Sequence, residues 1–193
     1  PVIVETWAPG MYAGQAVAEI LYGKVNPSAK LAITIPRSVG QLQMIYNHKP
    51  SQYFHPYAVK PSTPLWPFGY GLSYTTYKYD DLKLSAKEVS QNQNVEVSVK
   101  VTNTGQRDGV EIVQLYIRDK YSSVTRPVKE LKDFARVALK AGESKVVTFT
   151  ITPDKLAFYD KKMKWIVEPG EFVVMAGASS ADESLLKETF ILK

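Results

Sequence analysis

The chain contains 193 residues, of which 45% are hydrophobic and 22% charged, with no cysteine and two histidines. This composition excludes a wholly disordered chain, and the length suits one large domain or one small domain with part of another. The missing cysteines exclude a disulfide scaffold, a thiolate zinc site and a cysteine nucleophile. No apolar run is long enough to predict a membrane span.

The formal net charge of +5 is dispersed along the chain. Residues 1–79 hold six basic and two acidic side chains, and residues 80–193 hold 18 and 17. A nucleic-acid groove requires clustered basic residues interleaved with exposed aromatic ones, so we expect no nucleic-acid partner. The densest cluster, Lys161–Lys164, predicts a solvated hairpin tip.

Residues 1–36 have the pattern of an α/β domain. The apolar run 1–7 predicts a strand buried on both faces, residues 11–22 predict a helix that ends at Gly23, and residues 31–35 predict a second strand. Such a unit cannot cover its own sheet. We therefore expect residues 1–36 to be the C-terminal βαβ piece of an α/β sandwich domain, and the chain to be a fragment.

Residues 37–76 differ in character from what precedes them. Five prolines lie between positions 50 and 67, and nine of the 22 aromatic residues lie between Tyr53 and Tyr79. Flexible linkers are rich in glycine and serine and poor in rings. The composition predicts an ordered connector whose aromatic rings pack against its neighbours.

Residues 77–193 predict an all-β domain. Val95, Val97, Val99 and Val101 alternate with polar residues, which is the period of a half-buried strand. Seven or more short strands separated by turn residues are typical of a fibronectin type III-like sandwich. The remaining predicted strands cover Tyr77–Leu84, Val110–Arg118, Phe134–Leu139, Lys145–Ile151, Leu156–Tyr159, Lys164–Val167, Glu171–Ala176 and Thr189–Leu192.

Motifs that suggest chemistry have plainer structural explanations. Gly10–Gly14 lacks the spacing of a phosphate loop, and Gly69–Ser73 lacks the second glycine of a nucleophile elbow, so each predicts a turn. His48 and His55 are seven residues apart with no acid between them. Metal ligands usually lie closer together in sequence, so packed or solvated histidines are favoured over a metal site, with one of them bonding a polar ligand as the alternative.

The carboxylates do not form a catalytic pair. Glycoside hydrolysis generally takes two carboxyl groups on opposite sides of a sugar. The α/β part offers only Glu5, near the ligand-binding side of a sheet, and Glu19, on a polar helix face. The acids of the β part lie on turns and solvent faces. We predict no catalytic residue in this chain.

Aromatic side chains of the connector are candidates for contact with a sugar. Tyr53, Phe54, Tyr57 and Trp66 lie outside regular predicted structure, and aromatic faces stack on the apolar faces of pyranose rings. Most of these rings are expected to pin the connector to the domains. Tyr53, Phe54 and Trp66 are the residues we expect near substrate.

The sequence resembles, from end to end and in order, the C-terminal part of family 3 glycoside hydrolases, the β-glucosidase and β-xylosidase group. The resemblance is carried by Trp7-Ala8-Pro9-Gly10, Asn26-Pro27-Ser28-Ala29-Lys30-Leu31, Tyr46-Asn47-His48-Lys49-Pro50, Pro64–Thr75, Val113-Gln114-Leu115-Tyr116, Arg126–Lys132 and Glu168-Pro169-Gly170.

This resemblance implies a retaining exo-acting enzyme that hydrolyses terminal β-linked sugars of a glucoside or related oligosaccharide. Its Asp nucleophile lies on an N-terminal barrel and its acid/base Glu in the α/β domain upstream, so neither maps onto this sequence. No metal or other cofactor is implied. The chain would support the missing barrel and α/β domain and contribute contacts at outer subsites. Family habit places such enzymes in the bacterial periplasm or outside the cell.

A second hypothesis is a non-catalytic fibronectin III-like module that binds carbohydrate or a protein partner. The N-terminal half-domain distinguishes the two hypotheses, because a free-standing module would not begin in mid-sheet with Pro1-Val2-Ile3-Val4.

Overall fold

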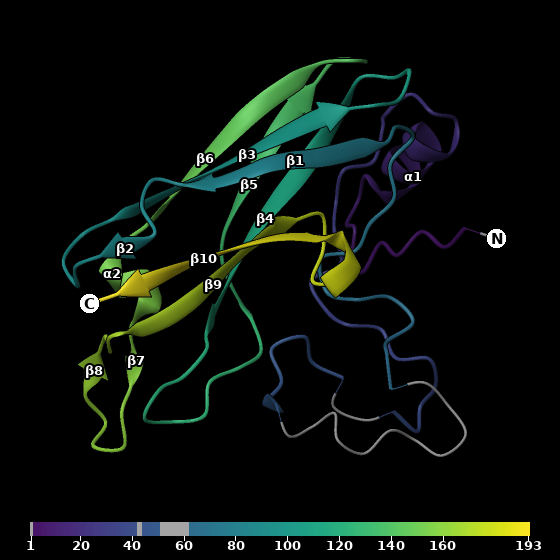
Figure 1. The fold of residues 1–193 in the computed structure, drawn as a ribbon. Coiled ribbons are helices and arrows are strands. Elements are labelled where there is room, and N and C mark those ends of the chain that lie inside the picture. Colours follow the sequence, from purple (N-terminus) through teal and green to yellow (C-terminus); the bar gives the residue numbers. More distant parts are fainter. Residues whose placement is uncertain (1, 42–43, 51–61) are drawn as a thin grey trace.

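Alternating apolar side chains in the C-terminal half produce two facing β-sheets in the computed structural model, which describes residues 2–41, 44–50 and 62–193 (Figure 1). One sheet has the strand order β1-β3-β6 and the other the order β2-β10-β9-β4-β5. All pairs are antiparallel except β2 with β10. The strands are β1 (Tyr77–Leu84), β2 (Glu88–Val89), β3 (Val95–Asn103), β4 (Gly109–Asp119), β5 (Glu130–Leu139), β6 (Ser144–Ile151), β9 (Gly170–Gly177) and β10 (Leu185–Leu192).

The core lies between the two sheets. Val97 and Val99 of β3 are fully buried and belong to the same apolar cluster as Val113 and Leu115 of β4. Phe172 and Phe190, from β9 and β10, stack with their ring centroids 5.4 Å apart. Burial of each such side chain stabilises the fold by about 1.5–3 kcal/mol. The predicted fibronectin type III-like sandwich is confirmed, because the period-two pattern sends every second side chain into one interior.

The outer face of the larger sheet is also covered. Tyr116 of β4 points away from the sandwich core and packs with Met175 under Tyr46 and Phe68 of the connector. Tyr46 and Phe68 stack with their ring centroids 4.2 Å apart. For these two rings the connector packs as its composition predicts, and β4 is buried on both faces.

The N-terminal segment forms the predicted helix, α1 (Ala13–Leu21), but the predicted flanking strands are not formed in its described residues. Residues 2–7 pair with no strand, and Ile35 makes a single antiparallel bridge to Trp66. A strand exists only through hydrogen bonds to a neighbour, and in the described residues neither segment forms a ladder of such bonds.

Smaller differences lie between β6 and β9. The predicted strand 156–159 is instead a helical turn, α2 (Pro153–Leu156), followed by β7 (Phe158–Tyr159), because a proline at the first helical position favours the turn. β7 pairs with β8 (Trp165–Ile166), and the exposed Lys161–Lys164 segment is the tip of this hairpin, as predicted. A 3₁₀ turn, Asp182–Ser184, precedes β10.

The largest differences in the strands concern two starting points and one strand that was not predicted, while several other strand ends differ by one or two residues. β5 and β10 each begin four residues earlier than their sequence pattern indicates, and the two-residue strand β2 was not predicted. The first four residues of β5 and β10, and both residues of β2, have no alternating apolar pattern. They are strands because a longer neighbouring strand, β4, β9 or β10, provides hydrogen-bond partners.

Leu115→Ala should destabilise the sandwich by about 2–5 kcal/mol, because the buried side chain leaves a cavity in the core. Val146→Ala, on the exposed side of β6, should change the free energy of unfolding by about 0.5 kcal/mol or less. Urea titration followed by circular dichroism measures both values. Equal losses for the two variants would contradict the assigned interior.

Candidate functional site

The N-terminal segment and the connector meet the sandwich at a docking joint, made of Asn26, Lys30, residues 68–76 and the β4 side chains Glu111 and Gln114. These groups are separated in sequence by up to 88 residues and are brought together by β4. The hydrogen bonds of this joint link the described segments, and they include Gly69 and Ser73 of the glycine-containing motif.

Glu111 is the buried charge of the docking joint. Its side chain is 2% exposed, and both carboxylate oxygens lie 3.2 Å from the Lys30 ammonium, whose side chain is 13% exposed. The Tyr79 hydroxyl donates a 2.7 Å hydrogen bond to the same carboxylate. Burial raises the pKa of Tyr79 far above its usual range and the neighbouring carboxylate raises it further, so the hydroxyl remains a donor.

Asn26 ties three segments together. Its amide nitrogen donates to the Asp108 carbonyl at 3.0 Å, and its amide oxygen accepts from the Ser73 hydroxyl at 2.9 Å and from the Tyr74 backbone at 2.8 Å. Ser73 is therefore a turn residue that holds the connector, which agrees with the structural explanation of its motif.

The glycines of the connector allow close approach at the docking joint. Gly69 has a φ of +79°, and a Cβ there would lie 2.0 Å from the Gln114 amide oxygen. Gln114 donates to the Gly69 carbonyl at 3.1 Å and to the Ala178 carbonyl at 2.7 Å. A Cβ at Gly71 would lie 2.4 Å from the Ala29 carbonyl. Glycine is the residue that fits both positions.

The C-terminal end of α1 is anchored to the sandwich beside the docking joint. Arg107 donates to the Gly23 carbonyl at 2.9 Å, and its guanidinium lies over the Tyr74 ring. The Tyr74 hydroxyl donates to the Ile20 carbonyl at 2.6 Å. The orientation of α1 is thus fixed by the sandwich, while Leu21 and Tyr22 remain exposed.

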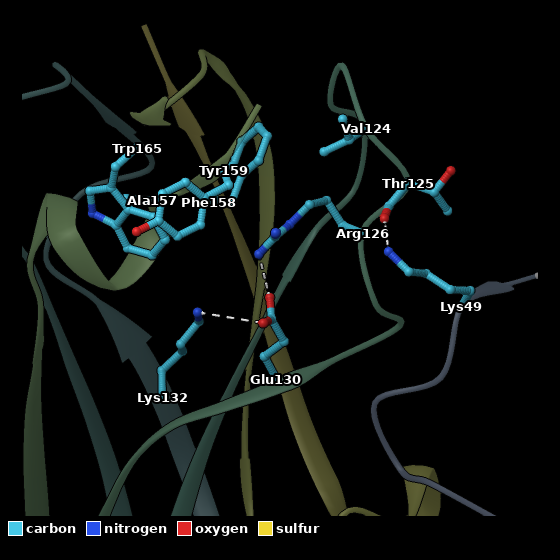
Figure 2. Close-up of a pocket in the computed structure, with 10 residues that line it drawn as sticks. All are labelled: Lys49, Val124, Thr125, Arg126, Glu130, Lys132, Ala157, Phe158, Tyr159 and Trp165. Carbon is cyan, nitrogen blue, oxygen red and sulfur yellow. Dashed lines mark hydrogen bonds and ion pairs between the residues drawn. The ribbon is translucent and has the colours of Figure 1, made fainter. Parts of the chain in front are cut away.

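Two surface cavities lie near the connector. The larger, of about 760 Å³, is formed by connector residues 44–50 and 63–67 together with β9 and the turn before β10. The smaller, of about 470 Å³, lies between β5, the β4–β5 loop and the β7–β8 hairpin (Figure 2). Both combine aromatic or aliphatic side chains with several charged ones.

His48 and Lys129 are the buried titratable groups of the larger cavity. His48 Nδ1 lies 2.8 Å from the Lys49 carbonyl and therefore carries the proton of the bond. Burial lowers the pKa of His48, and the nearby Lys129 charge lowers it further. Burial also lowers the pKa of Lys129, although its ammonium lies 3.1 Å from Asp182 and donates to the Ser180 carbonyl at 2.8 Å. His48 is thus a packed histidine, as the sequence favours.

The candidate aromatic residues remain predictions. Tyr53 and Phe54, with Tyr57 and His55, lie outside the described residues. Trp66 is half-buried, lines neither of the two cavities and is held by its backbone against Ile35. Of the candidate aromatic residues, only Trp66 is among the described ones, and it lines neither of the two cavities.

The two N-terminal acids have local partners. Glu5 accepts a 2.8 Å hydrogen bond from the Trp7 backbone. Glu19 accepts from Lys24 at 2.7 Å and from Gln15 at 3.0 Å, and the Lys24 bond lowers the pKa of this carboxyl. A glycosidase proton donor needs a raised pKa, so the surroundings of Glu19 oppose that role.

Across residues 2–41, 44–50 and 62–193, no group of three or more metal-binding side chains is found. In the same described ranges, no helix is long and apolar enough to cross a membrane.

The sequence analysis did not identify the groups of the docking joint. Glu111 and Gln114 carried a usable signal, because they are polar residues in the otherwise apolar stretch Val110–Ile117. A buried polar residue needs a partner, so their position indicates that other segments reach β4. Nothing in the pattern indicated that the partners would be Lys30 and Gly69.

Comparison with known proteins gives two family matches. The glycosyl hydrolase family 3 C-terminal domain matches residues 1–74, and a fibronectin type III-like domain matches residues 111–180. The resemblance to family 3 glycoside hydrolases is thereby confirmed.

Individual relatives give the same result. The periplasmic β-glucosidase of Salmonella typhimurium is 44% identical over 189 residues, which cover 93% of this chain and 25% of that enzyme. A β-xylosidase of Formosa agariphila is 45% identical, covering 100% of this chain and 27% of that enzyme. The solved structure of a β-glucosidase from Erythrobacter marinus superposes with a TM-score of 0.89 at 45% identity, covering 93% of this chain and 24% of that one. The chain thus spans about a quarter of the length of these relatives.

Lys30→Met should destabilise the chain by about 3–5 kcal/mol, because it leaves the Glu111 carboxylate buried without a counter-charge. In a double-mutant cycle, Lys30→Met with Glu111→Gln should cost less than the sum of the single changes by about 0.5–3 kcal/mol. Chemical denaturation measures the cycle. Glu188→Gln, in the exposed pair with Lys87, is the matched control and should cost about 1 kcal/mol or less. Additive single changes at Lys30 and Glu111 would show that the pair is not coupled.

Acidification should weaken the fold through His48. The pKa of His48 lies below its ordinary value of 6.5, so the unfolded chain binds the proton first as the pH falls through that value. The free energy of unfolding should therefore fall, by at most about 1.4 kcal/mol per pH unit for this group. Urea titrations from about pH 8 to about pH 5 should give a shallower slope for His48→Gln than for the unaltered chain. Parallel slopes would contradict this assignment.

Proposed function

Because the chain belongs to glycoside hydrolase family 3 and corresponds to its C-terminal part, we propose that it supports the catalytic domains of a β-glycosidase without supplying the catalytic pair. The enzyme hydrolyses terminal β-linked sugars of glucosides or related oligosaccharides with retention, using an Asp and a Glu that lie upstream. The match of the family 3 domain to residues 1–74 supports this proposal over a free-standing fibronectin-like module.

The single observation that carries the proposal is the apolar surface of the N-terminal segment. Val2, Ile3, Trp7, Leu21 and Tyr22 are all largely exposed, and α1 buries no residue. Several large apolar side chains left exposed on one segment indicate an interface. Its proposed occupant is the rest of the α/β domain, whose sheet residues 1–36 would complete.

The docking joint fixes the orientation of α1, and of its exposed apolar side chains, relative to the sandwich. Because Arg107 and Tyr74 hold the end of α1 and Glu111 holds Lys30, the sandwich of residues 77–193 and the connector of residues 37–76 present α1 in one orientation. A supporting domain that orients an active-site domain in this way contributes by preorganisation. Its role requires no acid or base of its own.

We place the enzyme in the bacterial periplasm or outside the cell. The periplasmic relative from Salmonella typhimurium and the lack of cysteine in this chain are compatible with that location. Fractionation of the source cells, with assay of aryl β-glucoside hydrolysis in each fraction, tests it. Activity confined to the cytoplasm would contradict the placement.

A chimera tests the supporting role. The matching C-terminal part of the Salmonella typhimurium enzyme is replaced by this chain, and hydrolysis of an aryl β-glucoside is measured. The chimera should be active, and the 193-residue chain alone should not be. Leu21→Glu should abolish activity of the chimera because it buries a charge at the interface, yet leave the unfolding of the isolated chain unchanged because Leu21 is exposed there.

Lys161→Glu, at the exposed hairpin tip, is the control charge change and should leave the chimera active. Two results would refute the supporting role. One is turnover by the isolated chain that is lost when one of its own carboxylates is changed. The other is an active Leu21→Glu chimera with unaltered stability.

A further inference from the structure

The β7–β8 hairpin exposes two aromatic rings side by side. Tyr159 and Trp165 are cross-strand partners, 57% and 52% exposed, and their ring centroids lie 4.8 Å apart at 58°. Their neighbours Phe158 and Ile166 alternate to the other face, where Phe158 is buried. Rings with a polar group at one end are suited to contacts that are partly apolar and partly wet.

A polar wall faces these rings across the smaller cavity. Figure 2 shows the Arg126 guanidinium between the Phe158 ring and Glu130, with Lys132 on the side of Trp165. The Arg126 guanidinium lies 4.6 Å from the Phe158 ring centroid and donates a 2.6 Å hydrogen bond to Glu130 Oε2. This pair fixes the position of the carboxylate at the floor of the cavity.

Lys132, the third charged residue of this group, forms no hydrogen bond with Glu130. Lys132 Nζ lies 3.8 Å from Glu130 Oε1, which is too long for a hydrogen bond, and within the described residues Lys132 makes no other polar contact. A donor and an acceptor therefore stand next to each other with unused capacity. Two adjacent hydroxyl groups, each able to donate and accept, match such a pair.

We propose that this cavity is a binding subsite for a β-linked oligosaccharide, with a pyranose ring stacked on Trp165 and its vicinal hydroxyls bridging Glu130 and Lys132. The volume of about 470 Å³ lies within the range of small-molecule pockets. The subsite belongs to the sandwich and is separate from the supporting role proposed above. It contributes binding, and none of its residues acts on the glycosidic bond.

Other occupants fit the lining less well. An apolar protein surface would bury Glu130 and Lys132 without completing their hydrogen bonds, which is costly. A phosphate-like anion would meet the Glu130 carboxylate at the floor. A sugar has both the apolar face for the rings and the hydroxyls for the charged pair.

The test titrates cellotetraose, and separately xylotetraose, into the isotopically labelled 193-residue chain while its tryptophan indole N–H signals are followed by NMR. The chain has three tryptophans, and the signal lost in Trp165→Phe identifies Trp165. Saturable movement of that signal with at least one of the two sugars is expected. Hydrolysis is not measured, so the result is independent of the proposed function.

Matched variants assign the contacts. Trp165→Ala should weaken binding about tenfold by removing the stacking surface, and Lys132→Met about two- to tenfold by removing a donor. Trp165→Ala also removes the 3.2 Å hydrogen bond to Asp154, so Lys132→Met is the variant that leaves the hairpin intact. For Lys132→Met, binding is read from the indole signal of Trp165, and for Trp165→Ala by calorimetry. Tyr22→Ala, which changes an exposed aromatic residue directly after α1 and outside the cavity, should bind as the unaltered chain does.

Three results would overturn the subsite. The first is no saturable shift with either sugar at millimolar concentration. The second is unchanged affinity in both Trp165→Ala and Lys132→Met while thermal unfolding shows them folded. The third is an equal loss in Tyr22→Ala, which would indicate unspecific contact with exposed rings.

Discussion

A carboxylate buried at the end of the sandwich core, Glu111, is the constraint on which the arrangement of the chain depends. Its counter-charge comes from Lys30, which is 81 residues earlier, and its second partner is the hydroxyl of Tyr79 on the opposite sheet. An unpaired charge at this depth would destabilise the fold by several kcal/mol. The Glu111 carboxylate therefore has its counter-charge only when the N-terminal segment lies against the sandwich. The two matched regions of the chain are therefore linked energetically as well as covalently.

The connector turns this electrostatic constraint into a fixed geometry. Tyr46 and Phe68 cover the outer face of β4 and β9, and the glycines at 69 and 71 let the backbone come within contact of Gln114 and Ala29. Linkers of this length without rings leave domains free to reorient. Here the rings and glycines remove that freedom, and α1 is held by its C-terminal end in one orientation.

The two ends of the sandwich thus have different tasks. The end at the docking joint presents α1 and the exposed apolar segment 2–7, which suits the interior of a larger protein. The hairpin end exposes the rings of Tyr159 and Trp165 beside the Glu130–Lys132 ion pair, which is too long for a hydrogen bond. These groups suit a ligand with an apolar face and several hydroxyl groups. β4 carries Glu111 and Gln114 of the docking joint, while β5 and the β4–β5 loop line the smaller cavity, so one sheet positions both surfaces.

The sequence by itself determined the sandwich, since alternation such as Val95 to Val101 is a local property with one physical solution, burial of one face. It also determined α1, the hairpin tip and the family, because these are carried by contiguous residues. It did not determine the strands at 2–7 and 31–35, which require a neighbouring sheet to exist. Only the tertiary structure decided that Lys30 neutralises Glu111, that Gly69 meets Gln114, and that Arg126, Glu130 and Trp165 share a cavity. Those contacts join segments far apart in the chain, and no local period records which distant residue will arrive.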